Sequence, residues 1–196
     1  MRLLAIDPGS RVTGWGVIER DAQGGLHLIG YGTLRPPADQ PSPQRLAQIH
    51  AGVVDLLTAH EPQALAIEEA FLGKNIKSAI RLAEARAVVL LAAVNAGATL
   101  FELPPALVKK SVTGHGRASK DTVRDQVMAQ LGWDPGARPP AYDASDALAI
   151  GLCALRRSEG PVGLLSGRPI GRTRRGGRGG WTQRDIERLT QRGSDA

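Results

Sequence analysis

Two short apolar runs, each ended by a carboxylate, constrain the fold of this chain more than any other feature. The first run, 3–6, ends at Asp7 and is followed by Pro8-Gly9-Ser10. The second run, 64–67, ends at Glu68. Uninterrupted apolar runs of this length are typical of strands buried on both faces of a sheet. Neighbouring strands lie about 4.8 Å apart, so the two carboxylates meet if these strands pair in parallel.

The rest of the pattern predicts an α/β fold with a mixed five-stranded sheet flanked by helices. Polar, Gly-rich connections between the first three strands favour an antiparallel meander. Strand–helix–strand units then follow. The further strands are expected at 14–19, 26–33 and 99–103, and the helices around 46–57 and at 76–96, 105–112, 119–131 and 143–157.

The longest predicted helix, 76–96, carries apolar residues on one face. That face is formed by Ile76, Ile80, Ala83, Ala87, Leu90, Leu91 and Val94. Lys77 and Arg81 lie four residues apart on the exposed face, a like-charge pair that costs stability unless an anion offsets it. A nucleic-acid phosphate would do so, and so would Glu84, so an ordinary solvated face is an equal alternative.

Basic charge is concentrated at the end of the chain. Residues 1–156 hold 16 Lys and Arg against 15 Asp and Glu, whereas residues 157–196 hold 9 Arg against 4 acidic residues. The Gly- and Arg-rich stretch 160–180 cannot bury a core and is predicted to be disordered. For the end piece, 181–192, a short helix and a disordered segment are equal alternatives. We therefore predict a domain at 1–157 and a basic tail at 158–196. The tail either binds polyanions such as nucleic acid or is an extension without a function.

Composition excludes several classes of protein. A single cysteine, Cys153, rules out an internal disulfide framework and a zinc–cysteine cluster. The longest apolar run, 87–94, is far shorter than the roughly 20 residues of a membrane span. The apolar start of the chain is too short for a signal peptide. These features predict a cytoplasmic protein without membrane contact.

A second pair of carboxylates, Asp143 and Asp146, lies where the last predicted helix begins. Together with Asp7 and Glu68 they would make an oxygen-rich pocket for hard divalent cations such as Mg²⁺ or Mn²⁺. Two such ions about 3.5–4 Å apart can activate water and stabilise the leaving oxygen of a phosphodiester. The four histidines show no ligand spacing.

Each carboxylate also has a structural explanation. Asp7 could simply end a strand before a turn, and Asp143 with Asp146 could cap a helix and favour its dipole. Glu68 has a neighbour, Glu69, and one of the two could be merely solvated. The concurrence of four carboxylates favours the metal site.

The segments 6–18, 66–75 and 143–150 resemble the three acidic motifs of the RuvC family, the bacterial Holliday junction resolvases. The resemblance covers residues 1 to about 157. It implies an RNase H-like fold and a homodimeric crossover junction endodeoxyribonuclease. Such an enzyme makes paired nicks in two opposed strands of a four-way DNA junction, leaving 5′-phosphate and 3′-hydroxyl ends, in recombination and repair.

By motif position, the resemblance implies that Asp7, Glu68, Asp143 and Asp146 hold two Mg²⁺ ions, with Mn²⁺ as a substitute. It selects Glu68 over Glu69. It also names the RuvA–RuvB branch-migration complex as a candidate partner, and the helix 76–96 as the dimer element.

The resemblance also implies roles for other side chains. Lys109 and Lys120 would bind phosphate, with Lys120 stabilising charge in the transition state. Phe71 would stack on an unpaired base, although a core position is the alternative from the residues alone. His115 lacks a visible partner for proton transfer. The remaining candidates for DNA backbone contact are Lys74, Lys77, Arg81, Lys110 and Arg117.

Three rival functions are weaker. An ATPase of the actin and hexokinase kind also begins with a strand ending in Asp-x-Gly, but it needs a second phosphate loop, which this chain lacks. A junction-binding protein without catalysis would have lost a carboxylate. Another RNase H-like nuclease, acting on hybrids or simple duplex, has the same fold and differs only in local motifs. The resemblance implies that members of the family end soon after the last helix, so the tail after residue 157 is a departure from the family pattern.

Overall fold

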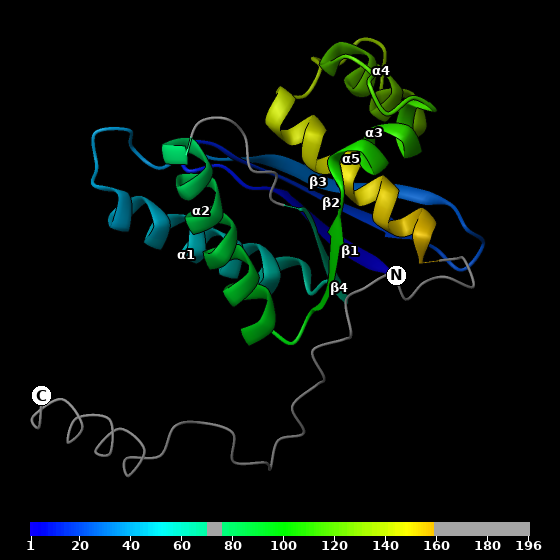
Figure 1. Cartoon of the computed structure of the whole chain (residues 1–196). Coiled ribbons are helices and arrows are strands. Elements are labelled where there is room, and N and C mark those ends of the chain that lie inside the picture. Colours follow the sequence, from blue (N-terminus) through cyan, green and yellow to red (C-terminus); the bar gives the residue numbers. More distant parts are fainter. Residues whose placement is uncertain (70–75, 159–196) are drawn as a thin grey trace, which may run out of the picture.

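The computed structural model describes residues 1–69 and 76–158, which form one mixed sheet between two layers of helices (Figure 1). The strand order is β3-β2-β1-β4-β5. The strands are β1 (Arg2–Asp7), β2 (Thr13–Arg20), β3 (Leu26–Leu34), β4 (Ala64–Glu68) and β5 (Thr99–Leu103). The first three form an antiparallel meander, and β1–β4 and β4–β5 pair in parallel, which confirms the predicted sheet.

Helices cover both faces of this sheet. One layer contains α1 (Ser42–His60) and α2 (Ile76–Asn95), and the other contains α3 (Pro105–Thr113), α4 (Lys120–Gln130) and α5 (Tyr142–Arg157) (Figure 1). The predicted helices therefore exist; α1 begins four residues earlier and ends three residues later than its predicted apolar positions, and the ends of the other helices differ by one residue or none. No helix in the described part of the chain is long and apolar enough to cross a membrane.

The central strand β1 has apolar side chains on both faces because both faces are covered. Leu3 and Ala5 pack with α5, whereas Leu4 and Ile6 pack with α1 and α2. A Cβ built on Gly151 of α5 would lie 3.2 Å from the Cβ of Ala5. Small residues at this contact therefore bring α5 directly against the strand, and α5 is buried along most of its length.

The apolar face that the sequence predicts for α2 is not the face that the helix buries. The helix buries Ala85, Val89, Ala92 and Ala93, whereas Ile76, Ile80, Ala83, Ala87, Leu91 and Val94 are exposed and Leu90 is half-buried. This helix has apolar residues on two sides. The side toward the sheet and α1 carries mainly alanine and valine, with Leu90 packed against the same core.

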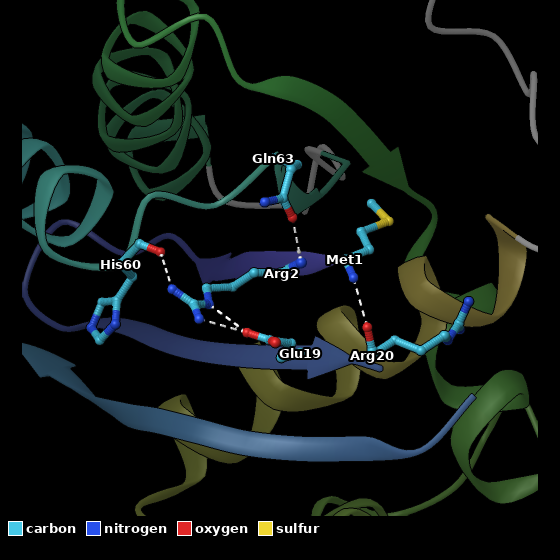
Figure 2. A network of polar contacts seen from close by, with 6 residues as sticks. All are labelled: Met1, Arg2, Glu19, Arg20, His60 and Gln63. Carbon is cyan, nitrogen blue, oxygen red and sulfur yellow. Dashed lines mark hydrogen bonds and ion pairs between the residues drawn. The ribbon is translucent and has the colours of Figure 1, made fainter. Parts of the chain in front are cut away.

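A polar network closes the edge of the sheet where β1 begins (Figure 2). The amino group of Met1 donates to the carbonyl of Arg20 over 2.6 Å. Arg2 donates from Nε to Glu19 Oε2 (2.7 Å) and from Nη1 to the carbonyl of His60 (2.8 Å). These contacts join β1 to the end of β2 and to the end of α1, at the edge away from the carboxylates.

Candidate active site

Asp7 and Glu68 are the last residues of two neighbouring parallel strands. Ile6 pairs with Ile67 in the register of β1 and β4, so the next residue of each strand is a carboxylate at the same edge of the sheet. The predicted adjacency of Asp7 and Glu68 therefore follows directly from the pairing of the two apolar runs.

The turn after Asp7 is tight and internally bonded. Thr13 is fully buried, and its Oγ1 donates to the carbonyl of Gly9 over 2.8 Å and accepts from the Gly9 N–H over 3.3 Å. A Cβ on Gly9 would lie 2.2 Å from the carbonyl oxygen of Val12, so only glycine fits. These contacts fix the backbone next to Asp7.

Helix α5 brings the second pair of carboxylates to the same edge. Gly14 pairs with Asp7 across β1 and β2, and a Cβ on Gly14 would lie 1.8 Å from the carbonyl oxygen of Asp143. The first turn of α5 therefore rests on bare backbone beside Asp7. The N-cap of α5 is Ala141, so Asp143 is not the cap residue; it lies in the first turn, with Asp146 three residues later.

A cleft of about 300 Å³ opens among these elements. Three of the four carboxylates and two lysines, Lys109 and Lys120, line it. The carboxylates are Asp7, Glu68 and Asp146, and the other lining residues are Pro105, Val108, Val123, Ala149 and Ile150.

Both acidic side chains of α5 face cations. Lys120 Nζ donates to Asp146 Oδ2 over 2.8 Å. Asp143 is not part of the lining of the cleft, and its Oδ2 lies 4.0 Å from a guanidinium nitrogen of Arg35. The structure thus places Lys109 and Lys120 in the same cleft as three of the four carboxylates.

The electrostatics of the cleft strongly affect Asp7. Burial, followed by repulsion from Asp146, Glu68 and Asp143, raises the pKa of Asp7 to about 7, although Lys120 opposes the shift. Burial and Asp146 also raise the pKa of Glu68. The hydrogen bond to Asp146 raises the pKa of Lys120. Negative charge is therefore concentrated here beyond what the lysines offset.

The donor set fits a hard divalent cation in its chemistry and charge. All candidate ligands are carboxylate oxygens, the type that Mg²⁺ and Mn²⁺ prefer, and a cation would remove the repulsion that raises the pKa of Asp7. Within residues 1–69 and 76–158, however, no three His, Cys, Asp or Glu side chains are grouped closely enough to hold one ion as they stand. Asp146 is turned toward Lys120, so chelation requires side-chain rotation.

The other predicted DNA contacts lie outside the cleft. Lys77, Arg81, Lys110 and Arg117 are exposed, and so is His115. The backbone N–H of His115 donates to Thr113 Oγ1 over 3.1 Å, which accounts for its place in the turn. Phe71 and Lys74 lie outside the described residues, as do the predicted disorder of the tail and the predicted helix at 181–192.

Three further residues near the site were not predicted from the sequence. Arg35 approaches Asp143, and Arg86 of α2 donates from Nε to the carbonyl of Glu68 (3.2 Å) while pairing with Glu102 of β5. Tyr142 begins α5 directly before Asp143. No local pattern marks them, because each acts on a residue distant in the sequence or on main chain.

The sheet order, the two helical layers and the acidic cleft at the strand ends define an RNase H-like nuclease. The family model described as "Crossover junction endodeoxyribonuclease RuvC" matches residues 3–154. The chain therefore belongs to the RuvC family of crossover junction endodeoxyribonucleases. Membership implies a nuclease that depends on divalent metal ions.

Individual relatives agree with this assignment. The crossover junction endodeoxyribonuclease RuvC of Dehalococcoides mccartyi is 45% identical over 153 residues, covering 78% of this chain and 91% of the relative. The solved structure of Thermus thermophilus RuvC has a TM-score of 0.70 at 33% identity, covering 79% of this chain and 93% of that one. The structure of T. thermophilus RuvC in complex with Holliday junction substrate has a TM-score of 0.69 at 29% identity. The match covers 79% of this chain and 92% of that one.

The similarity extends past α5 in some relatives. The RuvC of Magnetococcus marinus is 39% identical over 178 residues, covering 91% of this chain and 96% of the relative. A match of this length includes part of the segment after residue 157. The expectation that relatives end soon after the last helix is therefore wrong for this relative.

Proposed function

We propose that this chain resolves four-way DNA junctions by hydrolysing one phosphodiester in each of two opposed strands, leaving 5′-phosphate and 3′-hydroxyl ends, in recombination and repair. One observation carries the proposal: Asp7 and Glu68, on neighbouring strand ends, share a cleft with Asp146 and Lys120. Family membership and the junction bound to the T. thermophilus relative support the substrate.

Asp7, Glu68, Asp143 and Asp146 would hold two Mg²⁺ ions, with Mn²⁺ as a substitute. Bound ions of this kind activate a water and stabilise the leaving oxygen of a phosphodiester. The protein itself supplies a carboxylate set fixed by β1, β4 and α5. Lys120, at the rim of the cleft, is positioned to compensate charge that develops on the phosphoryl oxygens, and Lys109 to bind an adjacent phosphate.

A second copy of the chain would cover the exposed apolar side of α2. Ile76, Ile80 and Leu91 are exposed by 74, 53 and 54%, which is unusual for large apolar residues along one helix. A two-fold dimer presents two equivalent sites, as a nearly two-fold junction requires. Lys77 and Arg81, exposed on the same helix, would then contact phosphates near the crossover.

The remaining contacts follow from the same placement. Phe71 would stack on an unpaired base, and Lys74, Lys110 and Arg117 would contact the DNA backbone. The basic segment 158–196 would add salt-sensitive affinity. A cytoplasmic location and docking of the RuvA–RuvB complex are part of the same proposal.

Cleavage of a labelled synthetic four-way junction tests the proposal. The junction is compared with matched linear duplex and RNA–DNA hybrid, with EDTA, Mg²⁺ or Mn²⁺. We expect symmetric nicks in the junction alone, dependent on the metal. Stronger cutting of duplex or hybrid would keep the nuclease but overturn the substrate, and metal-independent cutting would overturn the role of the carboxylates.

A further inference from the structure

The first turns of α4 and α5 lie side by side, and side chains join them in two places. Lys120 of α4 donates to Asp146 of α5, as described above. One residue later, Asp121 Oδ1 accepts a hydrogen bond of 2.5 Å from the hydroxyl of Tyr142. Tyr142 is the first residue of α5, directly before Asp143.

A guanidinium completes this second connection. Arg124 lies one turn after Asp121, and its Nη2 is 3.3 Å from Asp121 Oδ1. Its Cζ also lies 4.4 Å from the ring centroid of Tyr142, within the range of a cation–π contact. Asp121, Arg124 and Tyr142 thus form a three-membered cluster, which we call the α4–α5 clasp.

The clasp bears on the site because the side chain of Lys120 is itself 65% exposed. The position of Lys120 therefore depends on how the first turn of α4 is held, by the buried side chain of Val123 and by the clasp. The opposite end of α4 is tied to α5 by Arg156, which donates to Gln130 over 2.7 Å. When Asp146 turns away from Lys120, the clasp still provides a polar connection between the two first turns.

We propose that Tyr142, acting through the α4–α5 clasp, is a positioning residue that keeps Lys120 within reach of the scissile phosphate. The inference rests on the proposed role of Lys120 in cleavage. Tyr142 touches none of the four carboxylate side chains through a described contact; it sets the distance between the helix that carries Lys120 and the helix that carries Asp143 and Asp146. Its ring and hydroxyl have separate partners, Arg124 and Asp121.

A double-mutant cycle tests this role. Tyr142→Phe removes the hydroxyl and keeps the ring over Arg124, and it is combined with Lys120→Ala. In the wild-type background we expect Tyr142→Phe to slow single-turnover junction cleavage about two- to tenfold, the range that one hydrogen bond contributes. In the Lys120→Ala background we expect the same change to have no further effect, because residues that act as a unit are non-additive.

The chain's other tyrosine gives a matched control. Tyr31→Phe, whose ring packs on Trp133 with centroids 4.9 Å apart, should leave cleavage unchanged. A second readout, in the metal-free protein, is hydrogen exchange of a peptide spanning α4, which should be faster in Tyr142→Phe only. Junction affinity should not change, and the melting temperature should change little, since the Asp121 side chain that loses the hydrogen bond is 67% exposed.

Three results would overturn the inference: an equal loss in both backgrounds, no loss in the wild-type background, or a loss that follows junction affinity. The proposed function is tested separately by the wild-type protein. If the wild-type cuts junctions but Lys120→Ala cuts equally well, the role of Lys120 falls and the inference falls with it, while junction resolution remains.

Discussion

Replacing Asp7 by asparagine should stabilise the metal-free protein while abolishing cleavage. In the folded protein, burial and three neighbouring carboxylates raise the pKa of Asp7 from 3.8 to about 7. A group whose pKa is raised in this way binds protons more tightly when folded. Its ionised form therefore opposes folding, and the cost grows as the pH rises from about 4 to about 7.

The magnitude follows from the two pKa values. At about 1.4 kcal/mol for each pKa unit, moving from 3.8 to about 7 corresponds to about 4 kcal/mol above pH 7. The amide of asparagine is also polar and takes the same buried place, so the substitution recovers only part of this cost. We expect a gain of about 1–4 kcal/mol at pH 8 for Asp7→Asn and almost none at pH 4.

Urea unfolding followed by tryptophan fluorescence, in EDTA at pH 4, 6 and 8, measures this gain. Asp55→Asn, on the exposed side of α1, is a matched control that should show no pH-dependent gain. Adding Mg²⁺ at pH 8 should stabilise the wild-type protein more than Asp7→Asn, because the cation offsets the same repulsion.

An unchanged free energy of unfolding at pH 8 would refute the electrostatic argument. A gain that is equal at pH 4 and pH 8 would do so as well, since it would have to come from packing. Junction binding should survive the substitution, and loss of binding together with cleavage would indicate that Asp7 is mainly structural.

Gly14→Ala should cost about 2 kcal/mol or more in urea unfolding and slow cleavage, because its Cβ would overlap the carbonyl of Asp143; wild-type values would contradict the close approach of α5. Lys120→Ala should lower the cleavage rate about 10²- to 10³-fold in single-turnover assays with little change in junction affinity. Ile80→Asp should yield a monomer in sedimentation that no longer cuts two strands together, whereas an intact dimer would exclude this side of α2. Deleting 158–196 should weaken junction binding at low salt and spare the cleavage rate, and an inactive truncation would refute an accessory role for the tail.

The sequence predicted the sheet and the acidic edge because both depend on short, local patterns. Every position in the runs that end at Asp7 and Glu68 is apolar, so both faces of each strand are apolar. Such a strand is stable only where helices cover both faces of the sheet. Parallel pairing then places the two carboxylates together without further information.

Features that depend on which surfaces meet could not be predicted in this way. The apolar periodicity of α2 identified a helix, but it could not show that alanines rather than Ile80 and Leu91 face the sheet. Likewise, the pairing of Lys120 with Asp146 joins residues 26 apart in the chain. The carbonyl contact between Arg86 and Glu68 uses backbone, which no residue pattern reports.

The burial of α5 has a consequence for how the enzyme fails. Two of the four carboxylates belong to the helix that is enclosed along most of its length by the sheet, α3 and α4. A segment enclosed in this way opens only with the whole domain, as the slowest-exchanging part of a protein does. Heating should therefore leave activity intact until global unfolding, and the temperature of half-inactivation should coincide with the midpoint of the unfolding transition.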